Sequence, residues 1–272
     1  TLYLNMLIKI LKNIILFISI LLSSNLLIAQ SAEEKIAIVK QSLEQEQDNA
    51  LRGDLYIKLA KLYHSTNPNE GIIFAHKALI LGKSLKKSTL KFEAYNVLFW
   101  LHYNKNNQET VNDSLKIYIN LLDKENKTIN IPLYNVRYLE SKGIFHSVFN
   151  FRKEALECFI QAYEIGVKHN VSKDIVADIL NQISNTLYRN KNYREALKYY
   201  QKALKLHDSE VQKGIVLLNI ASLYKDKFNQ QDTAQIFFKE AHTYFKKSNS
   251  KALQAIVLIN QGSYFDYKKE YD

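Results

Sequence analysis

The chain has 272 residues, of which 47% are hydrophobic, which is enough to bury the core of one or two domains. Only seven glycines and two prolines occur, so few positions suit the tight turns of a sheet and an all-α fold is predicted. The formal charge is +10, but the lysines are dispersed along the chain rather than clustered, so nucleic acid is not expected as a partner. The single cysteine, Cys158, excludes an intrachain disulfide and a cysteine metal cluster.

The N-terminal residues have the order of an export signal. Lys9 and Lys12 precede an apolar run over residues 14–29, and the run ends in small residues. We predict that residues 1–30 form a signal peptide, with an uncleaved membrane anchor as the alternative. The protein is therefore expected to be exported, and to be periplasmic or associated with the inner membrane on its periplasmic side.

The next elements are predicted as helices. Residues 31–49 hold a capping helix, with Ser31 as its N-cap and Glu33 and Glu34 in its first turn. Residues 55–63 and 71–82 form a first helix pair, and a less regular second pair follows over about 90–122. The loop over residues 124–132 is the longest irregular stretch and is predicted to be a flexible joint.

Beyond Pro132 the chain repeats a spacing of small and aromatic residues. A small residue is followed twelve or thirteen positions later by alanine, then by an aromatic residue four positions on and a second alanine after three more. Small side chains let two helices approach closely, while the aromatic ring fills the space beside them. The three units are Gly143 with Ala155, Phe159 and Ala162; Ser184 with Ala196, Tyr200 and Ala203; and Ala221 with Ala234, Phe238 and Ala241. Their period of about 40 residues is typical of stacked helical hairpins.

These residues resemble the pattern of the tetratricopeptide repeat. The resemblance implies a right-handed superhelical solenoid of antiparallel helix pairs, with about five and a half pairs over residues 50–272. It also implies a non-catalytic scaffold whose partner is a protein or peptide. The pairs Leu180-Asn181, Leu218-Asn219 and Ile259-Asn260 make the chain similar to exported repeat arrays of sensor kinases and membrane-linked transcription regulators of the Bacteroidetes type.

That similarity leads to a hypothesis about the whole protein. The chain is expected to be the periplasmic sensory or interaction module of a longer signal-transduction protein, which could carry a C-terminal membrane span and a histidine kinase. A stand-alone periplasmic scaffold or assembly protein is the alternative, and a nucleic-acid-binding helical repeat is a weaker one. Gly262 matches Gly143, and Tyr271 matches Tyr193, so the next alanine is expected at position 274 and the last pair is predicted to be truncated.

No motif predicts catalysis, a cofactor or a metal site. Gly82-Lys83-Ser84 lacks the earlier glycine of a phosphate-binding loop, and the seven histidines show no zinc-binding spacing. A binding surface is better supported, because Asn181, Asn185 and Arg189 lie four residues apart on one helix face. By the family resemblance that face lines a concave groove, together with Asn219, Ser222, Asn260 and Ser263. An ordinary solvated helix face is the alternative interpretation.

Overall fold

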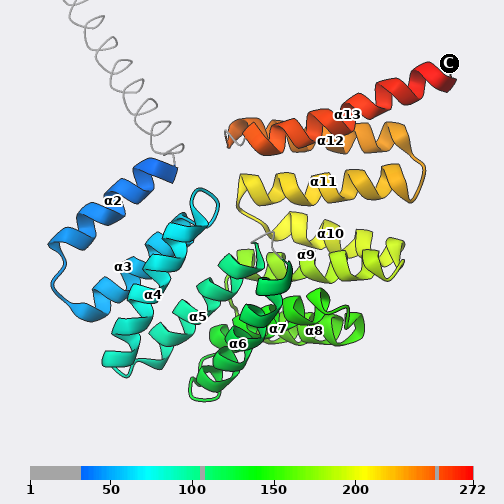
Figure 1. Cartoon of the computed structure of the whole chain (residues 1–272). Coiled ribbons are helices and arrows are strands. Elements are labelled where there is room, and N and C mark those ends of the chain that lie inside the picture. The colour runs from blue at the N-terminus through cyan, green and yellow to red at the C-terminus, as the bar shows by residue number, and fades with distance from the viewer. Residues whose placement is uncertain (1–31, 105–107, 249–250, 272) are drawn as a thin grey trace, which may run out of the picture.

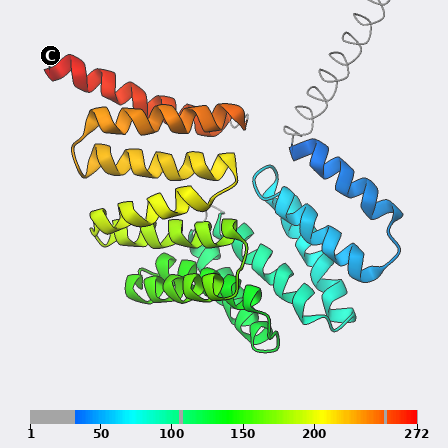
Figure 2. The ribbon, with the colours of Figure 1, turned by 180° about the vertical axis from the view of Figure 1, so that it is seen from behind.

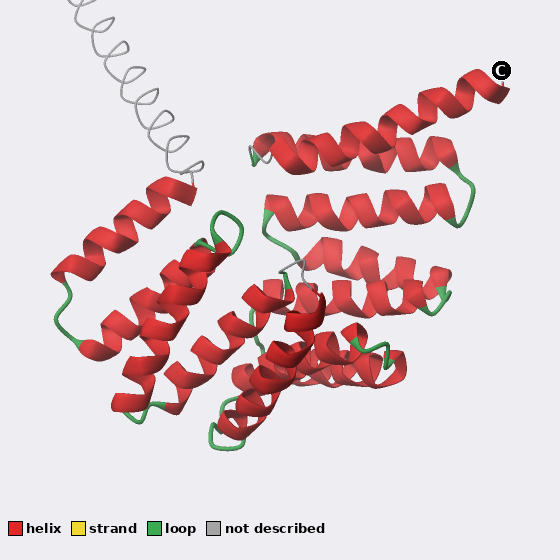
Figure 3. Cartoon of the chain, viewed as in Figure 1, coloured by secondary structure: helices red, strands yellow, loops and turns green. Residues whose placement is uncertain are grey.

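The computed structural model describes residues 32–104, 108–248 and 251–271, and these ranges contain helices and no strand (Figure 3). The prediction of an all-α fold is confirmed. The helices are α2 (Ala32–Gln45), α3 (Asn49–Leu62), α4 (Pro68–Ser84), α5 (Ser88–Tyr103), α6 (Gln108–Asn126), α7 (Pro132–Val148), α8 (Arg152–Lys168), α9 (Lys173–Arg189), α10 (Tyr193–Leu206), α11 (Glu210–Asp226), α12 (Gln231–Lys247) and α13 (Lys251–Tyr271).

Consecutive helices pack as hairpins that stack into a solenoid. The pairs are α3–α4, α5–α6, α7–α8, α9–α10 and α11–α12, while α2 packs on α3 and α13 on α12. The first helices of neighbouring pairs also contact each other: α3 contacts α5, and α5 contacts α7. The whole array is a curved arc, with α2 and α13 at its two ends and α6 to α8 at its bend (Figures 1 and 2).

The second helix of each pair buries the same three positions. In α8, α10 and α12 these are the alanine, aromatic and alanine residues of the repeat, and each is at most 3% exposed. The same positions continue into the N-terminal half, where α4 has Ala75, Leu79 and Gly82, and α6 has Leu115, Ile119 and Leu122. The first residues of the five triplets are spaced by 40, 40, 41 and 38 residues. The repeat therefore runs unbroken through the region where its register could not be read from the sequence, because leucine and isoleucine replace alanine and an aromatic ring in α6.

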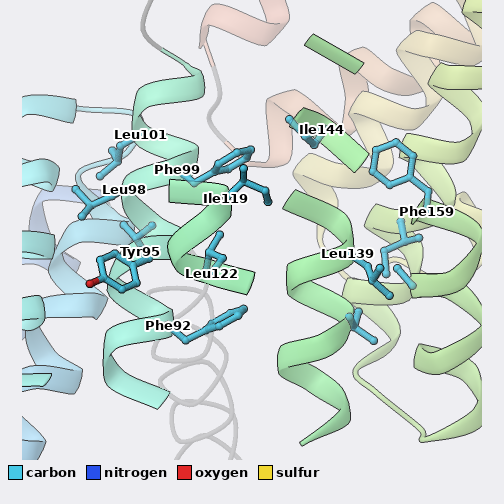
Figure 4. Close-up of a cluster of buried hydrophobic side chains, with 14 of the residues drawn as sticks. Phe92, Tyr95, Leu98, Phe99, Leu101, Ile119, Leu122, Leu139, Ile144 and Phe159 are labelled. Atoms are coloured by element: carbon cyan, nitrogen blue, oxygen red, sulfur yellow. The ribbon is translucent and has the colours of Figure 1, made fainter. Parts of the chain in front are cut away.

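The buried side chains form two hydrophobic clusters that share helix α11. The larger one runs from α2 to α11 and includes Phe92, Phe99 and Leu122, which lie between α5 and α6, and Phe159 of α8 (Figure 4). The smaller one joins α11, α12 and α13, and Phe238 and Phe245 are fully buried in it. Each helix pair thus buries its apolar face mainly against its neighbours, as expected for a solenoid.

Asparagine and lysine close the tight turns between helices, where glycine is more usual. Five such residues have positive φ angles between 52° and 65°: Lys86, Asn150, Asn170, Lys191 and Asn229. After α7, the amide of Phe151 donates to the carbonyl of His146 at 2.8 Å, which satisfies a carbonyl at the helix end. Asparagine tolerates this left-handed conformation better than most residues, so the chain turns sharply with few glycines.

Two predicted boundaries are wrong. Helix α3 begins at Asn49 rather than near Leu55, because the Asp48 carboxylate accepts the amides of Ala50 and Leu51 and caps the helix earlier. The loop predicted over residues 124–132 is shorter, since α6 continues to Asn126. Ile129 in this loop is only 9% exposed, so the loop is anchored in the core rather than serving as a joint.

The predicted signal peptide or anchor, residues 1–30, lies outside the described residues. Among the helices that are described, none combines the length and apolar character needed to cross a membrane.

Candidate functional site

A hollow of about 460 Å³ opens on the face formed by the first helices of the pairs. We call it the groove. Its lining comes only from α3, α5, α7, α9 and α11, and comprises Lys61, Asn96, Trp100, Arg137, Glu140, Ile175, Asp178, Asn181, Gln182 and Gln212. A smaller hollow of about 220 Å³ adjoins it and shares Lys61, Asn96 and Trp100. The stacking of five helix pairs therefore produces one surface to which each first helix contributes.

Asn96 and Trp100 sit one turn apart on α5 and both face the groove. Asn96 is only 8% exposed, and its side-chain oxygen accepts a hydrogen bond from the Ser141 hydroxyl of α7 at 2.9 Å. This bond fixes the side-chain amide, whose nitrogen has no hydrogen-bond partner among the described residues. Asn96 is therefore a preorganised donor beside an aromatic ring, a combination that suits a peptide carbonyl and a neighbouring apolar group.

The two cations of the groove are already paired with one carboxylate. Oε2 of Glu93 on α5 accepts a hydrogen bond from the Lys61 ammonium at 2.8 Å. Oε1 of the same carboxylate accepts a hydrogen bond from Nη1 of Arg137. The Glu93 side chain is 15% exposed and that of Arg137 is 23% exposed, so this pair is shielded from much of the solvent, whereas the Lys61 side chain is 46% exposed. The ion triad ties α3, α5 and α7 together across three consecutive pairs.

The carboxylates of the groove have no such partners. Glu140 of α7 makes no hydrogen bond or salt bridge with the described residues, and burial together with the nearby Asp178 raises its pKa to about 8, against an opposing effect of Arg137. Burial, with the neighbouring Asp174, also raises the pKa of Asp178 to about 6. Both shifts indicate carboxyl groups that lack donors in this site.

His207 lies beside the same carboxylates, in the turn after α10. Its side chain is fully buried, with Nδ1 3.6 Å from Oδ1 of Asp174 and Nε2 3.8 Å from Oδ1 of Asp178. Neither ring nitrogen has a hydrogen-bond partner in the described part of the chain. Burial lowers the pKa of His207, although Asp174 acts in the opposite direction, so the neutral ring is favoured near pH 7.

Two of the sequence-predicted binding residues meet near the groove. Asn181 lines it, and Asn219 of α11 donates its side-chain amide to the Asn181 side-chain oxygen at 3.4 Å. Asn185 is half-buried, and its side-chain oxygen accepts the Tyr200 hydroxyl at 2.6 Å, a contact within one helix pair. This bond occupies the Asn185 acceptor that a ligand would use.

The remaining predicted residues are not brought into the groove. Arg189 is exposed at the C-terminal end of α9, and its carbonyl accepts a hydrogen bond from Arg152. The Ser222 hydroxyl donates to the carbonyl of Leu218, and the Asn260 amide donates to that of Ile256. The side chain of Ser263 lies outside the described residues.

Sequence reasoning missed the residues that dominate the groove, which are Asn96, Trp100, Glu140 and Asp178. One signal for Asn96 was present, because it is an isolated polar residue within the apolar stretch 94–101. No signal in the spacing marks Glu140 and Asp178, which lie on different helices and meet only through stacking. Within the described part of the chain, no group of three or more His, Cys, Asp or Glu side chains could hold a metal ion.

The fold and the groove define a helical-repeat solenoid with a shared concave surface, and the comparisons agree with this class. A family model described as the tetratricopeptide repeat matches residues 175–247, which span α9 to α12. The comparison with curated proteins found no match. No enzyme family is indicated.

Three solved structures share the fold at low sequence identity. A Rap protein complexed with Competence and Sporulation Factor is 14% identical, with a TM-score of 0.60. The match covers 87% of this chain and 70% of the Rap protein chain. NprR in complex with its cognate peptide NprX is 16% identical with a TM-score of 0.60, covering 88% and 69%. BtubC from P. vanneervenii is 15% identical with a TM-score of 0.55, covering 81% and 93%. At this identity they establish the solenoid fold alone.

Proposed function

We propose that the protein is a binding scaffold that holds an extended peptide, or an extended segment of a protein, in the groove without catalysing a reaction. The preorganised amide of Asn96 is the observation that carries this proposal. Ser141 holds this amide in place, and its N–H donors, which have no partner among the described residues, are free to bind a peptide carbonyl. A rigid groove also lowers the entropic cost that a flexible binding surface pays on association.

The neighbouring groups support the same ligand class. Trp100 offers an aromatic surface one turn from Asn96, and the amides of Asn181, Gln182 and Gln212 supply further donors and acceptors along the groove. Two of the solved structures with this fold are complexes, that of NprR with its cognate peptide and that of a Rap protein with Competence and Sporulation Factor. Their likeness to this chain supports the proposal at the level of the scaffold.

Trp100 provides a direct test, because it is the only tryptophan of the chain. The probe is a pool of N-acetylated, C-amidated hexapeptides of random sequence without tryptophan or cysteine. We expect a saturable change in Trp100 emission. An Asn96→Ala variant should bind more weakly and raise the half-saturation concentration by about tenfold or more, as for loss of a buried hydrogen bond.

The matched control removes an amide outside the groove. Gln201 is exposed on α10, the second helix of its pair, so Gln201→Ala should titrate like the unaltered protein. Equal binding by all three proteins would show that Asn96 takes no part. No emission change in the unaltered protein would contradict the groove as a peptide site.

The proposal also has a cellular part, which rests on residues 1–30. In it the groove faces the periplasm, as the sensory or interaction module of a longer signal-transduction protein, and a stand-alone periplasmic scaffold is the alternative. The order of Lys9 and Lys12, an apolar run and small residues supports export. The gene sequence beyond residue 272 separates the two versions, since an apolar run of roughly 20 residues followed by an output domain fits only the first.

Export is tested with a bacterial alkaline phosphatase fused after residue 272, since this enzyme becomes active outside the cytoplasm, where its disulfides form. We expect high phosphatase activity from the full fusion and activity near background when residues 1–30 are deleted. Equal activity from the two fusions, at matched protein amounts, would contradict an export role for this segment.

A further inference from the structure

We propose that the groove selects peptides that carry a basic side chain, and that the ammonium or guanidinium group of this lysine or arginine binds between Glu140 of α7 and Asp178 of α9. This inference rests on the proposed peptide-binding function and specifies the chemistry of its ligand. It concerns a side chain of the peptide rather than a free N-terminus.

The first argument is the balance of donors and acceptors in the groove. Both cations of the lining, Lys61 and Arg137, are held by Glu93. Glu140 has no hydrogen-bond or ion-pair partner among the described residues, and Asp178 has only the His207 ring at 3.8 Å, which is beyond hydrogen-bond distance. The groove therefore has spare carboxylate acceptors, whereas its cations are already paired. A ligand that supplies N–H donors with positive charge complements this arrangement.

The second argument comes from a buried polar group beside Asp178. The His207 side chain is fully buried, its Nε2 lies 3.8 Å from Oδ1 of Asp178, and neither ring nitrogen has a hydrogen-bond partner among the described residues. Buried polar groups are normally satisfied, so an unpartnered ring next to a carboxylate of the groove indicates that a ligand is missing there.

The third argument is that the groove has room and a suitable wall for a long basic side chain. Its volume is about 460 Å³, and Trp100 and Ile175 contribute apolar surface to the same lining as Glu140 and Asp178. The methylene stem of lysine or arginine packs well on such surface while its charged end reaches the carboxylates. A carboxylate or phosphate ligand would instead be repelled by Asp178, and it would find Lys61 and Arg137 already paired with Glu93.

Binding of a cation here should be linked to proton release. Several groups face the two carboxyls: Arg137 on α7, Glu93 behind it on α5, Asp174 on α9, His207 after α10, and Lys213 of α11 near the histidine. With a pKa of about 8, Glu140 is largely protonated at pH 7 in the free protein. A cation next to it favours the charged form, so Glu140 gives up its proton on binding. Affinity for a basic peptide should therefore rise as the pH increases from 6 to about 8.5.

The experiment compares hexapeptide pools that differ at one position. The pools are acetylated and amidated, lack tryptophan and cysteine, and have arginine, lysine, citrulline or glutamate fixed at the third residue. Citrulline has nearly the shape of arginine but no charge. We expect the arginine and lysine pools to change Trp100 emission at concentrations at least about tenfold lower than the citrulline pool, and the glutamate pool to bind most weakly.

The variant Glu140→Gln/Asp178→Asn should remove the preference for arginine over citrulline and the rise of affinity with pH, while far-ultraviolet circular dichroism stays unchanged. Glu157→Gln is the matched control, because Glu157 is an exposed carboxylate on α8, the second helix of its pair, and does not line the groove. It should keep the preference. A pool with a free N-terminus and citrulline at the third residue separates a side-chain site from one for a terminal amine, since it should bind no better than its acetylated counterpart.

The outcomes separate this inference from the proposed function. If all pools change Trp100 emission at similar concentrations, or if the double variant keeps the arginine preference, the groove binds peptides but not through these carboxylates. Tighter binding of the free-amine pool would also contradict the inference, because the cation would then come from the N-terminus. If no pool changes the emission, both the inference and the proposed function are wrong.

Discussion

Replacing Phe238 with alanine is expected to lower the free energy of unfolding by about 3–5 kcal/mol, the usual cost of removing a fully buried aromatic side chain. Phe238 of α12 is 0% exposed, and it lies in the smaller cluster, which joins α11, α12 and α13. Because a solenoid is held together by contacts between neighbouring pairs, the loss should act first on the C-terminal helices. Hydrogen exchange should show lost amide protection in α11 to α13, while α3 to α8 remain protected.

The control for this variant is in the same helix. Ile236 is 64% exposed, so Ile236→Ala should change the free energy of unfolding by less than about 0.5 kcal/mol and leave hydrogen exchange unaltered. Equal loss of protection along the whole array in Phe238→Ala would contradict the expected local response. It would instead indicate that the two clusters unfold as one cooperative unit.

A second large effect is expected at Gly143, where Gly143→Ala should destabilise the protein by about 1–3 kcal/mol, as overpacking of a core does. An added Cβ at this position of α7 would lie 2.5 Å from Cε1 of Phe159. The ring of Phe159 is 1% exposed and cannot move aside without displacing its neighbours. Urea unfolding followed by circular dichroism measures the change.

Gly262 provides a matched control, since it stands at the corresponding position of α13 but a Cβ there would meet no atom of the described residues within 4 Å. Alanine has a higher helix propensity than glycine, so Gly262→Ala should be neutral or stabilising by up to about 1 kcal/mol. A Gly143→Ala protein as stable as the unaltered one would show that the contact between α7 and α8 relaxes easily. The pair of variants therefore measures how far close helix packing, rather than helix propensity, determines this position.

The helix pairs of the C-terminal half were predictable because their signal is local. Ala196, Tyr200 and Ala203 lie within eight residues of each other, and their spacing places them on one helix face whatever surrounds it. Where the same positions are filled by Leu115 and Leu122, the pattern no longer differs from any amphipathic helix. Their register needed the three-dimensional stacking to be recognised.

The candidate site was predicted only in part, for a related reason. Asn181 could be placed because it shares a helix face with Asn185, yet Asn185 bonds to Tyr200 and so serves packing within its pair. The spacing of side chains along one helix predicts which helix face they share. It does not predict which neighbouring residue each side chain will bond to. The Asn96 site depends on Ser141, which is 45 residues away in the sequence.

By itself the sequence determined the class of this protein: helical hairpins repeating about every 40 residues, with small residues where helices approach closely. That much follows from periodicity, because side chains three and four residues apart share a helix face. Only the tertiary structure decided where the groove lies and what charge it offers. Glu140 of α7 and Asp178 of α9 line one groove only because the helix pairs stack, and their raised pKa values arise from burial, which exists only once the solenoid has formed.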